Sequence, residues 1–208
     1  MVEGQIRPNK VTDLRLVEAL HEIPREVFVP QASRGIAYVD DDLAIGKGRY
    51  LLEPMVFARM LQEAGVQASD VVLDVGCATG YSTAVLSRLA ATVVGVEADA
   101  ELAAAATAAL AEVGSDNAIV VTGPHNAGYA SQAPYDLIVI AGKVSSVPAS
   151  LTSQLAEAGR LIAIVENESG VGEVRLYQRF GDAVSSRALF EANPHSIPGF
   201  EAEAKFVF

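Results

Sequence analysis

The stretch that decides the fold is VVLDVGCATG, residues Val71 to Gly80. Residues 71–75 are apolar apart from Asp74, which predicts a buried strand. Gly76 and Gly80 bracket a tight turn, because glycine adopts the positive φ angles that such turns need. An apolar helical pattern follows over residues 84–89. A strand, a glycine turn and a helix in this order predict a ligand site, since ligands of open α/β sheets bind beyond the carboxyl ends of the strands.

The same rhythm of short apolar runs and helical runs extends over the centre of the chain. We expect strands at 71–75, 92–97, 118–122, 136–140 and 160–165, and helices at 54–64, after Gly80, at 102–113 and at 148–157. The two ends differ from this centre, with an amphipathic helix at 12–22, an irregular segment at 24–47, and antiparallel edge strands at 173–180, 185–190 and 203–208. This order predicts a parallel sheet covered by helices on both faces.

Composition excludes several classes of protein. The chain has 208 residues, is 50% hydrophobic and carries a formal charge of −11, so it predicts one globular domain and disfavours a nucleic-acid partner. The only cysteine, Cys77, permits no internal disulfide and favours a reducing, cytoplasmic setting. We expect no signal peptide and no membrane span. The histidines His21, His125 and His195 lack metal-ligand spacing, so no metal is expected and they are interpreted as three unrelated residues.

The glycine turn does not have the pattern of a pyrophosphate site. A dinucleotide fingerprint starting at Gly76 needs glycine where the chain has Ala78 and Tyr81, and no Gly-Lys-Ser/Thr of a P-loop follows. Glu97 ends the next strand, where a carboxylate can accept hydrogen bonds from both hydroxyls of a ribose. Asp74 can face an ammonium group, directly or through water. A ribose and a cationic amino-acid moiety together describe S-adenosylmethionine; the alternative is a purely structural turn with Glu97 as a solvated strand end.

A series of short blocks extends along most of the chain. They are Pro24-Arg-Glu26, Phe28-Val-Pro30, Ala37-Tyr38, Asp40, Leu43, Ile45-Gly46, Gly48, Val75–Ala84, Val94–Glu97, Pro134-Tyr-Asp136, Val147-Pro148, Gln154-Leu155 and Gly159-Arg-Leu161. In these blocks the chain resembles the protein-L-isoaspartate O-methyltransferase family.

The resemblance implies a Rossmann-like class I methyltransferase fold with a seven-stranded, mostly parallel sheet. It also implies S-adenosylmethionine as methyl donor, S-adenosylhomocysteine as product, and methyl esterification of isoaspartyl carboxyls in damaged peptides or proteins, a repair activity. We expect a single domain over 1–208, with a cap and substrate-side segment at 1–53 and a cofactor-binding core at 54–208. The expected cofactor-binding residues are Asp74, Gly76, Cys77, Ala78, Thr79, Gly80, Glu97, Ala98, Gly123 and Pro124.

The chain departs from the family pattern in two motifs. Where the family usually has Gly-Gln-Thr-Ile-Ser-x-Pro, residues 48–54 read Gly-Arg-Tyr-Leu-Leu-Glu-Pro, so Leu52 stands at the active-site serine and Tyr50 at the threonine. The family's Gly-Asp-Gly appears as Gly-Pro-His over 123–125, without the carboxylate that would meet the adenine amino group. No catalytic residue is therefore assigned.

The acceptor side is expected to include Tyr50, Leu52, Glu53 and Pro54. An isoaspartyl carboxylate is already ionised at neutral pH, so positioning and desolvation matter more than a general base. Arg49 and Tyr50 are candidates to orient the substrate, whereas Glu53 would repel an anion. Two alternatives remain: a divergent enzyme with a different acceptor, and a cofactor-binding protein without isoaspartyl activity.

Overall fold

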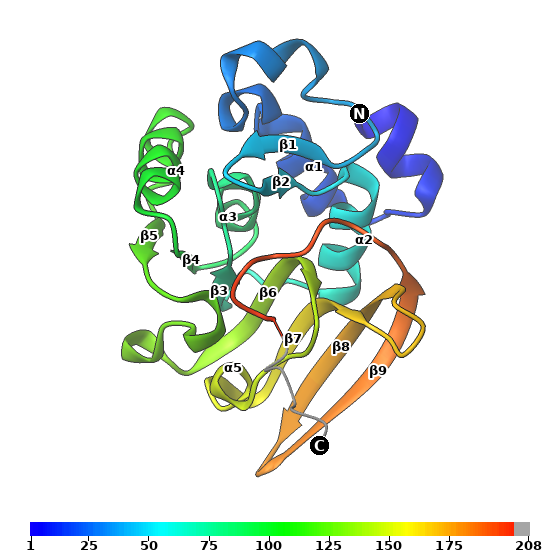
Figure 1. Ribbon diagram of the computed structural model, residues 1–208, viewed down its shortest axis with the longest axis vertical. Coiled ribbons are helices and arrows are strands. Elements are labelled where there is room, and N and C mark those ends of the chain that lie inside the picture. The colour runs from blue at the N-terminus through cyan, green and yellow to red at the C-terminus, as the bar shows by residue number, and fades with distance from the viewer. Residues whose placement is uncertain (202–208) are drawn as a thin grey trace, which may run out of the picture.

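A seven-stranded sheet forms the centre of the computed structural model, which describes residues 1–201 (Figure 1). The strand order is β5-β4-β3-β6-β7-β8-β9; the first five strands are parallel and the last two pairings are antiparallel. The bounds are β3 Val71–Val75, β4 Thr92–Glu97, β5 Ala118–Thr122, β6 Tyr135–Val144, β7 Leu155–Glu166, β8 Gly172–Phe180 and β9 Ala183–Glu191. The strand expected at 203–208 lies outside the described residues.

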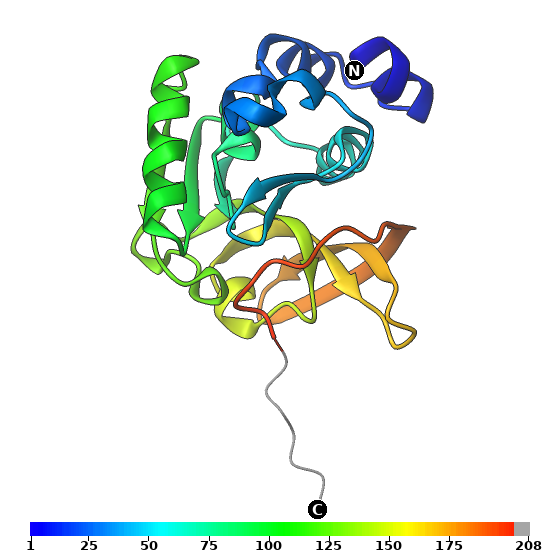
Figure 2. The ribbon, with the colours of Figure 1, turned by 45° about the horizontal axis from the view of Figure 1, so that its top comes forward.

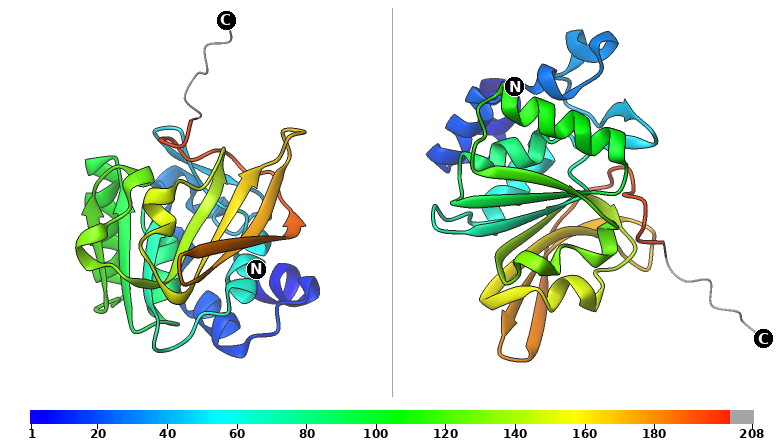
Figure 3. Two further views of the ribbon diagram at one scale, coloured as in Figure 1. Left: turned by 90° about the horizontal axis from the view of Figure 1, so that it is seen from below. Right: turned by 90° about the vertical axis from the view of Figure 1, so that its left-hand side faces the viewer.

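Helices cover both faces of this sheet, but unequally. The helices are α1 Leu14–Glu22, α2 Pro54–Ala64, α3 Tyr81–Ser87, α4 Ala100–Glu112 and the short α5 Ala149–Thr152. The N-terminal elements and α1 to α4 lie on one face, and α5 with the short turns His125–Ala127 and Ala130–Gln132 lies on the other (Figure 3). No helix among residues 1–201 is long and apolar enough to span a membrane.

The central strands β3 and β4 are buried on both sides, which explains their continuous apolar runs. Val72 and Val93 pack into the core beneath the long helices, whereas the next residues, Leu73 and Val94, pack into the core on the opposite face. All four side chains are fully buried. A residue period of two therefore supplies both cores from the same strands.

One expected helix is wrong in length. The helix predicted at 148–157 ends at Thr152, and β7 begins at Leu155 rather than at residue 160. Gln154 ends the helix: its amide nitrogen donates to the Ala127 and Ser150 carbonyls at 2.8 and 2.7 Å, and its own carbonyl accepts from the Tyr135 N–H at 2.8 Å. These contacts divert the chain into the sheet.

The segment expected to be irregular contains a hairpin, β1 Leu43–Gly46 and β2 Arg49–Leu51. Lys47 and Gly48 form its turn with φ angles of 53° and 69°, as two-residue hairpin turns require. Figure 2 shows the hairpin above the carboxyl ends of the parallel strands. The hairpin thus directs Arg49 toward the predicted ligand site.

The N-terminal segment is fixed to the sheet by buried polar contacts. Arg25 is fully buried and donates from Nε to the Ala37 carbonyl and from Nη2 to the Leu52 carbonyl, both at 2.7 Å. The Thr79 hydroxyl donates to the Phe28 carbonyl at 2.6 Å. These bonds join residues 25–52 to the glycine turn.

Residues 193–200, here called the C-terminal strap, cross the same edge of the sheet. Ser196 forms a parallel bridge with Lys143 at the end of β6. The Lys143 N–H donates to the His195 carbonyl at 3.2 Å, and the Ile197 N–H donates to the Lys143 carbonyl at 2.8 Å. In Figure 1 the strap is the red segment in front of β6 and β7.

Candidate active site

The glycine turn and Glu97 meet at the carboxyl ends of β3 and β4. Gly76, Ala78 and Gly80 have φ angles of 72°, 50° and 92°, which curl the chain back toward β4. The Gly76 N–H donates to the Val96 carbonyl at 2.8 Å. The turn and the neighbouring carboxylate therefore form one structural unit, as the sequence predicts.

Glu97 is 1% exposed and fully engaged in hydrogen bonds. Its Oε2 accepts from the Ala78 N–H at 2.8 Å, and its Oε1 accepts from the N–H groups of Ala98 and Asp99 at 2.9 and 3.1 Å. Burial opposes ionisation, but the hydrogen bond from His125 and the charge of Arg49 lower the pKa of Glu97 to about 2. Glu97 is thus a fixed carboxylate at neutral pH.

Arg49 provides the main cation at this carboxylate. Its side chain is 6% exposed, with Nη1 2.6 Å from Glu97 Oε2 and Nη2 donating to the Gly76 carbonyl at 2.7 Å. The sequence also allows a solvated loop position for Arg49, and this interpretation is wrong because the side chain is buried on a carboxylate; its expected role in orienting the substrate stays a prediction. The carboxylate belongs to the protein itself.

His125 is a site residue that the sequence did not reveal. It is 2% exposed, and its Nε2 lies 3.1 Å from Glu97 Oε1. Its Nδ1 donates to the Pro198 carbonyl of the strap at 2.8 Å. The interpretation of the three histidines as unrelated residues is therefore wrong for His125. Its place just after β5, the strand beside β4, is the signal that could have indicated it.

Asp74 lies inside the site and is wholly buried. Its Oδ2 accepts from the hydroxyls of Ser82 and Thr83, both at 2.6 Å, whereas its Oδ1 has no partner. Burial raises the pKa of Asp74 to about 6. A buried, unpartnered carboxylate oxygen suits a cationic group, directly or through one water. This oxygen and the Glu97 carboxylate fit the two ends of S-adenosylmethionine.

Among the other expected cofactor residues, the side chains of Cys77 and Thr79 are already buried or hydrogen-bonded within the protein. The Cys77 thiol is buried against Gly95, and burial raises its pKa, so only the backbone of this residue remains for a ligand. The Thr79 hydroxyl is used by Phe28. Gly123 and Pro124 follow β5 beside His125, and the Gly123 N–H donates to the Glu97 carbonyl at 3.0 Å.

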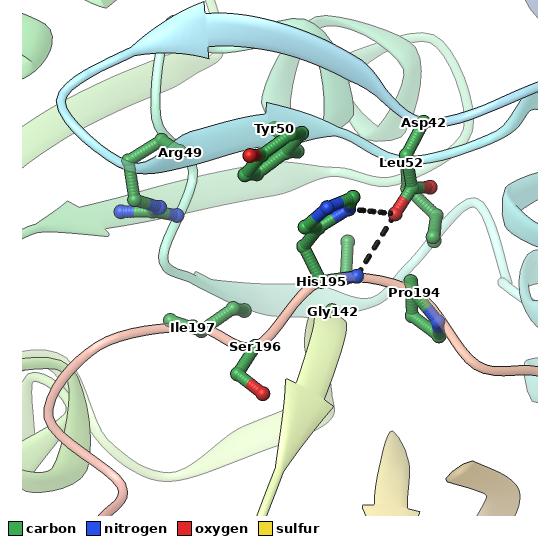
Figure 4. Close-up of a pocket in the computed structure, with 10 residues that line it drawn as sticks. Asp42, Arg49, Tyr50, Leu52, Gly142, Pro194, His195, Ser196 and Ile197 are labelled. Carbon is green, nitrogen blue, oxygen red and sulfur yellow. Dashed lines mark hydrogen bonds and ion pairs between the residues drawn. The ribbon is translucent and has the colours of Figure 1, made fainter. Parts of the chain in front are cut away.

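Two acceptor-side residues, Tyr50 and Leu52, face the strap (Figure 4). Tyr50 stacks on His195 with ring centroids 3.5 Å apart. Asp42 accepts from the backbone N–H of His195 at 2.9 Å and lies 3.0 Å from its Nδ1. Leu52 is buried, and Glu53 is half-buried, where burial and neighbouring aspartates raise its pKa. His195 is a second histidine that the sequence did not assign to the site.

Pro54, the remaining acceptor-side residue, is buried in the first turn of α2. Its side chain is part of the helix start. It lines neither cavity described below.

The space for a ligand is filled by the protein's own side chains. A cavity of about 20 Å³ lies among Tyr50, Leu52 and Cys77, and one of about 10 Å³ lies beside Arg49 and His195. Each holds a single water at most, whereas small-molecule sites usually measure roughly 300–1,000 Å³. The charged groups therefore fit the cofactor, but this conformation of the site is closed.

The space around two glycines, Gly76 and Gly142, shows which side chains fill the ligand site. A Cβ at Gly76 would lie 3.1 Å from both Arg49 Nη2 and Ile197 Cγ2, and a Cβ at Gly142 would lie 2.6 Å from Ile197 Cγ1. Among residues 1–201, no cluster of histidine, cysteine and acidic side chains is arranged to hold a metal ion.

Comparisons with known proteins agree with this fold. The chain is 42% identical over 162 residues to protein-L-isoaspartate O-methyltransferase of Koribacter versatilis, covering 78% of this chain and 73% of the relative. It is 38% identical over 181 residues to the enzyme of that name from Methanoculleus marisnigri, covering 87% and 82%.

Two solved structures share the fold. A protein-L-isoaspartate O-methyltransferase structure has a TM-score of 0.84 at 26% identity, covering 96% of this chain and 67% of that one, which confirms the predicted fold class. A Plasmodium falciparum homologue, solved in complex with S-adenosyl-L-homocysteine, has a TM-score of 0.79 at 19% identity, covering 95% and 96%. The family model for protein-L-isoaspartate(D-aspartate) O-methyltransferase matches residues 1–191. The predicted resemblance is confirmed, and the chain belongs to the protein-L-isoaspartate(D-aspartate) O-methyltransferase family.

Proposed function

We propose that this chain, as a member of its family, transfers a methyl group from S-adenosylmethionine to the side carboxyl of isoaspartyl residues in peptides and proteins. The observation that carries the proposal is Glu97, a buried carboxylate fixed by backbone N–H groups beside a glycine turn at the end of β4. When bound, S-adenosylmethionine supplies an activated methyl group on a sulfonium.

The core, residues 54–208, provides the cofactor side. Glu97 would accept from the ribose hydroxyls, and Asp74 Oδ1 would meet the ammonium group. Backbone groups of Gly76 to Gly80 and of Ala98 would line the amino-acid and ribose portions. Gly123 and Pro124 would line the adenine pocket, with Pro124 at the position of the family's usual aspartate and His125 next to it.

The cap, residues 1–53, provides the acceptor side together with Pro54. The acceptor carboxylate needs no general base because it is already ionised at neutral pH. The chain's contribution is to position it and to exclude water, and buried Leu52 supplies an apolar wall for that purpose. The Tyr50 hydroxyl is available to orient the carboxylate.

The partners and location follow from charge. A formal charge of −11 disfavours nucleic acids and anionic membranes, so we propose peptide and protein substrates in the cytoplasm.

A second candidate keeps the cofactor and changes the acceptor. Leu52 and Tyr50 replace the serine and threonine that the family usually has, and Leu52 removes a hydroxyl from the acceptor side. A carboxylate with an apolar neighbouring group, or an acceptor group other than a carboxylate, would suit the apolar surface that Leu52 forms. A cofactor-binding protein without methyl transfer is the remaining alternative.

A labelled-methyl assay separates these candidates. We expect base-labile label on an isoaspartyl peptide and none on the matched aspartyl peptide. Label that survives base would indicate a nitrogen or carbon acceptor, and saturable binding of S-adenosylhomocysteine without any transfer would indicate the binding protein. Calorimetry that detects no binding at high micromolar cofactor would refute all three.

A further inference from the structure

Arg49 has no established role in the reaction, yet its buried guanidinium contacts Glu97 on the cofactor side and lines a cavity with Tyr50 and Leu52 on the acceptor side. We propose that Arg49 is the acceptor-binding cation, held in reserve on Glu97 until the cofactor takes that carboxylate. This inference rests on the proposed function. It names the charge that recognises the acceptor and the order in which the two ligands bind.

The first step is that Arg49 occupies the position expected for the ribose. Five polar groups already surround Glu97: the Arg49 guanidinium, the His125 ring and the N–H groups of Ala78, Ala98 and Asp99. A carboxylate has about four lone-pair sites. Ribose hydroxyls can therefore bind only if a present partner leaves, and the backbone donors are fixed by the turn.

The second step is that Arg49 is the partner free to leave. It stands on the β1–β2 hairpin, whereas Glu97 is anchored in the central sheet. His125 is held from its other side by Pro198 of the strap. The long side chain of Arg49 contacts Glu97 and the Gly76 carbonyl, and its Nη1 lies 3.5 Å from His125 Nε2. The first two are contacts that the cofactor would replace.

The third step is that the released guanidinium needs another anion, because a buried cation without a partner is strongly unfavourable. Tyr50 and Leu52 line the small cavity beside His195 together with Arg49, and with Ala141 they line both small cavities. A rotation of Arg49 away from Glu97 thus leads toward the acceptor side.

The protein's own acids are poor substitutes there. Asp42 is engaged by the backbone N–H groups of His195 and Glu53. Glu53 lines an adjoining hollow of about 260 Å³, which shares Leu52 and His195 with the smaller cavity but which Arg49 does not line. Asp74 would be needed by the ammonium group. Two anions remain, the carboxylate of the cofactor's amino-acid portion and that of the acceptor. We assign Arg49 to the acceptor because it shares a cavity with Tyr50 and Leu52, and it can bind a carboxylate through two parallel N–H groups.

The binding order follows from this exchange. Without cofactor, Arg49 is neutralised by Glu97 and offers little attraction to a carboxylate. With cofactor, the charge is available to the acceptor. We therefore expect the acceptor to bind after the cofactor.

The test uses Arg49→Gln, which restores the residue usual in the family, with Arg49→Lys as the charge-retaining control. For Arg49→Gln we expect S-adenosylhomocysteine to bind about tenfold tighter, and the KM for an isoaspartyl peptide to rise about tenfold or more, as for a lost hydrogen bond to a charged group. Arg49→Lys should retain part of the acceptor affinity because it keeps the positive charge. It should not retain all of it, because lysine lacks the two parallel N–H groups of the guanidinium. A purely structural role would weaken both ligands together.

The role proposed for Arg49 is refuted if Arg49→Gln binds the cofactor with unchanged or weaker affinity, or if its KM for the peptide is unchanged. The proposed function still stands in that case if the wild type transfers methyl groups to the isoaspartyl peptide. If the wild type binds cofactor and methylates no isoaspartyl peptide, the function fails and the acceptor role of Arg49 fails with it. If Arg49→Gln does not fold, the wild type still decides: isoaspartyl peptide should bind at least about tenfold tighter with saturating S-adenosylhomocysteine. Equal affinity with and without it would refute the exchange.

Discussion

Glu97→Gln tests whether the closed site is held by one buried ion pair. The substitution preserves size and removes the charge opposite Arg49, where the two side chains are 1% and 6% exposed. Removing one partner of a buried pair costs about 3–5 kcal/mol. The pKa of Glu97 gives a similar figure, since lowering it from 4.5 to about 2 corresponds to roughly 3 kcal/mol. We expect the melting temperature to fall by about 6–12 °C, at about 2–4 °C per kcal/mol.

Urea unfolding at pH 7 of the wild type, Glu97→Gln, Arg49→Gln and the double variant measures the coupling. The double variant should lose less than the sum of the single losses, by about 1–3 kcal/mol. Lys47→Gln is the matched control, because its pair with Asp99 is exposed, and its urea midpoint should not change. Losses that add to within about 0.5 kcal/mol would refute a coupled pair.

The same pair sets a pH dependence. The folded pKa of Glu97 lies below its unfolded value, so its contribution to the free energy of unfolding is present above pH 4.5 and is lost as the pH falls from 4.5 toward 2. Glu97→Gln should remove this loss.

Three further changes probe the neighbouring groups. Asp74→Asn should abolish a decline in the free energy of unfolding of up to about 3 kcal/mol as the pH rises from 3.8 through about 6, because the raised pKa of Asp74 makes its ionisation unfavourable in the folded state; an unchanged pH profile contradicts this. Ile197→Ala should tighten S-adenosylhomocysteine about tenfold or more in calorimetry, since it removes buried contacts worth about 2–5 kcal/mol from the closed strap, whereas Val184→Ala on exposed β9 should not. Leu52→Ser should raise kcat/KM on an isoaspartyl peptide about tenfold by adding a hydroxyl donor to the carboxylate; equal or lower kcat/KM refutes an acceptor at this wall.

The central part of the fold is readable from the sequence because its strands are buried on both faces. The ranges predicted for β3, β4 and β5 agree with the structure at both ends. Continuous apolar runs between turn residues leave little choice of register or boundary. The glycine turn and Glu97 follow from the same pattern, because parallel strands bring their carboxyl ends to one edge.

The closing of the site could not be read in the same way. Arg49 reaches Glu97 from a hairpin 48 residues away along the chain, and local sequence does not say which way that hairpin points. His195 and Ile197 come from the strap, which follows the last described strand and returns across the sheet beside β6. The helix at 148–157 was predicted too long because the contacts of Gln154 are also tertiary.

Two of the departures from the family pattern, Arg49 and His125, meet at the same carboxylate in the structure. Arg49 replaces the usual glutamine in one motif, and His125 replaces the second glycine of another, 76 residues further along. Both side chains lie on Glu97, and Arg49 Nη1 is 3.5 Å from His125 Nε2. Two unrelated losses would not be expected to converge on one carboxylate. If they form a unit, His125→Gly alone should leave the Arg49 guanidinium bound to Glu97, and only the double reversion with Arg49→Gln should leave the carboxylate fully available to a ribose.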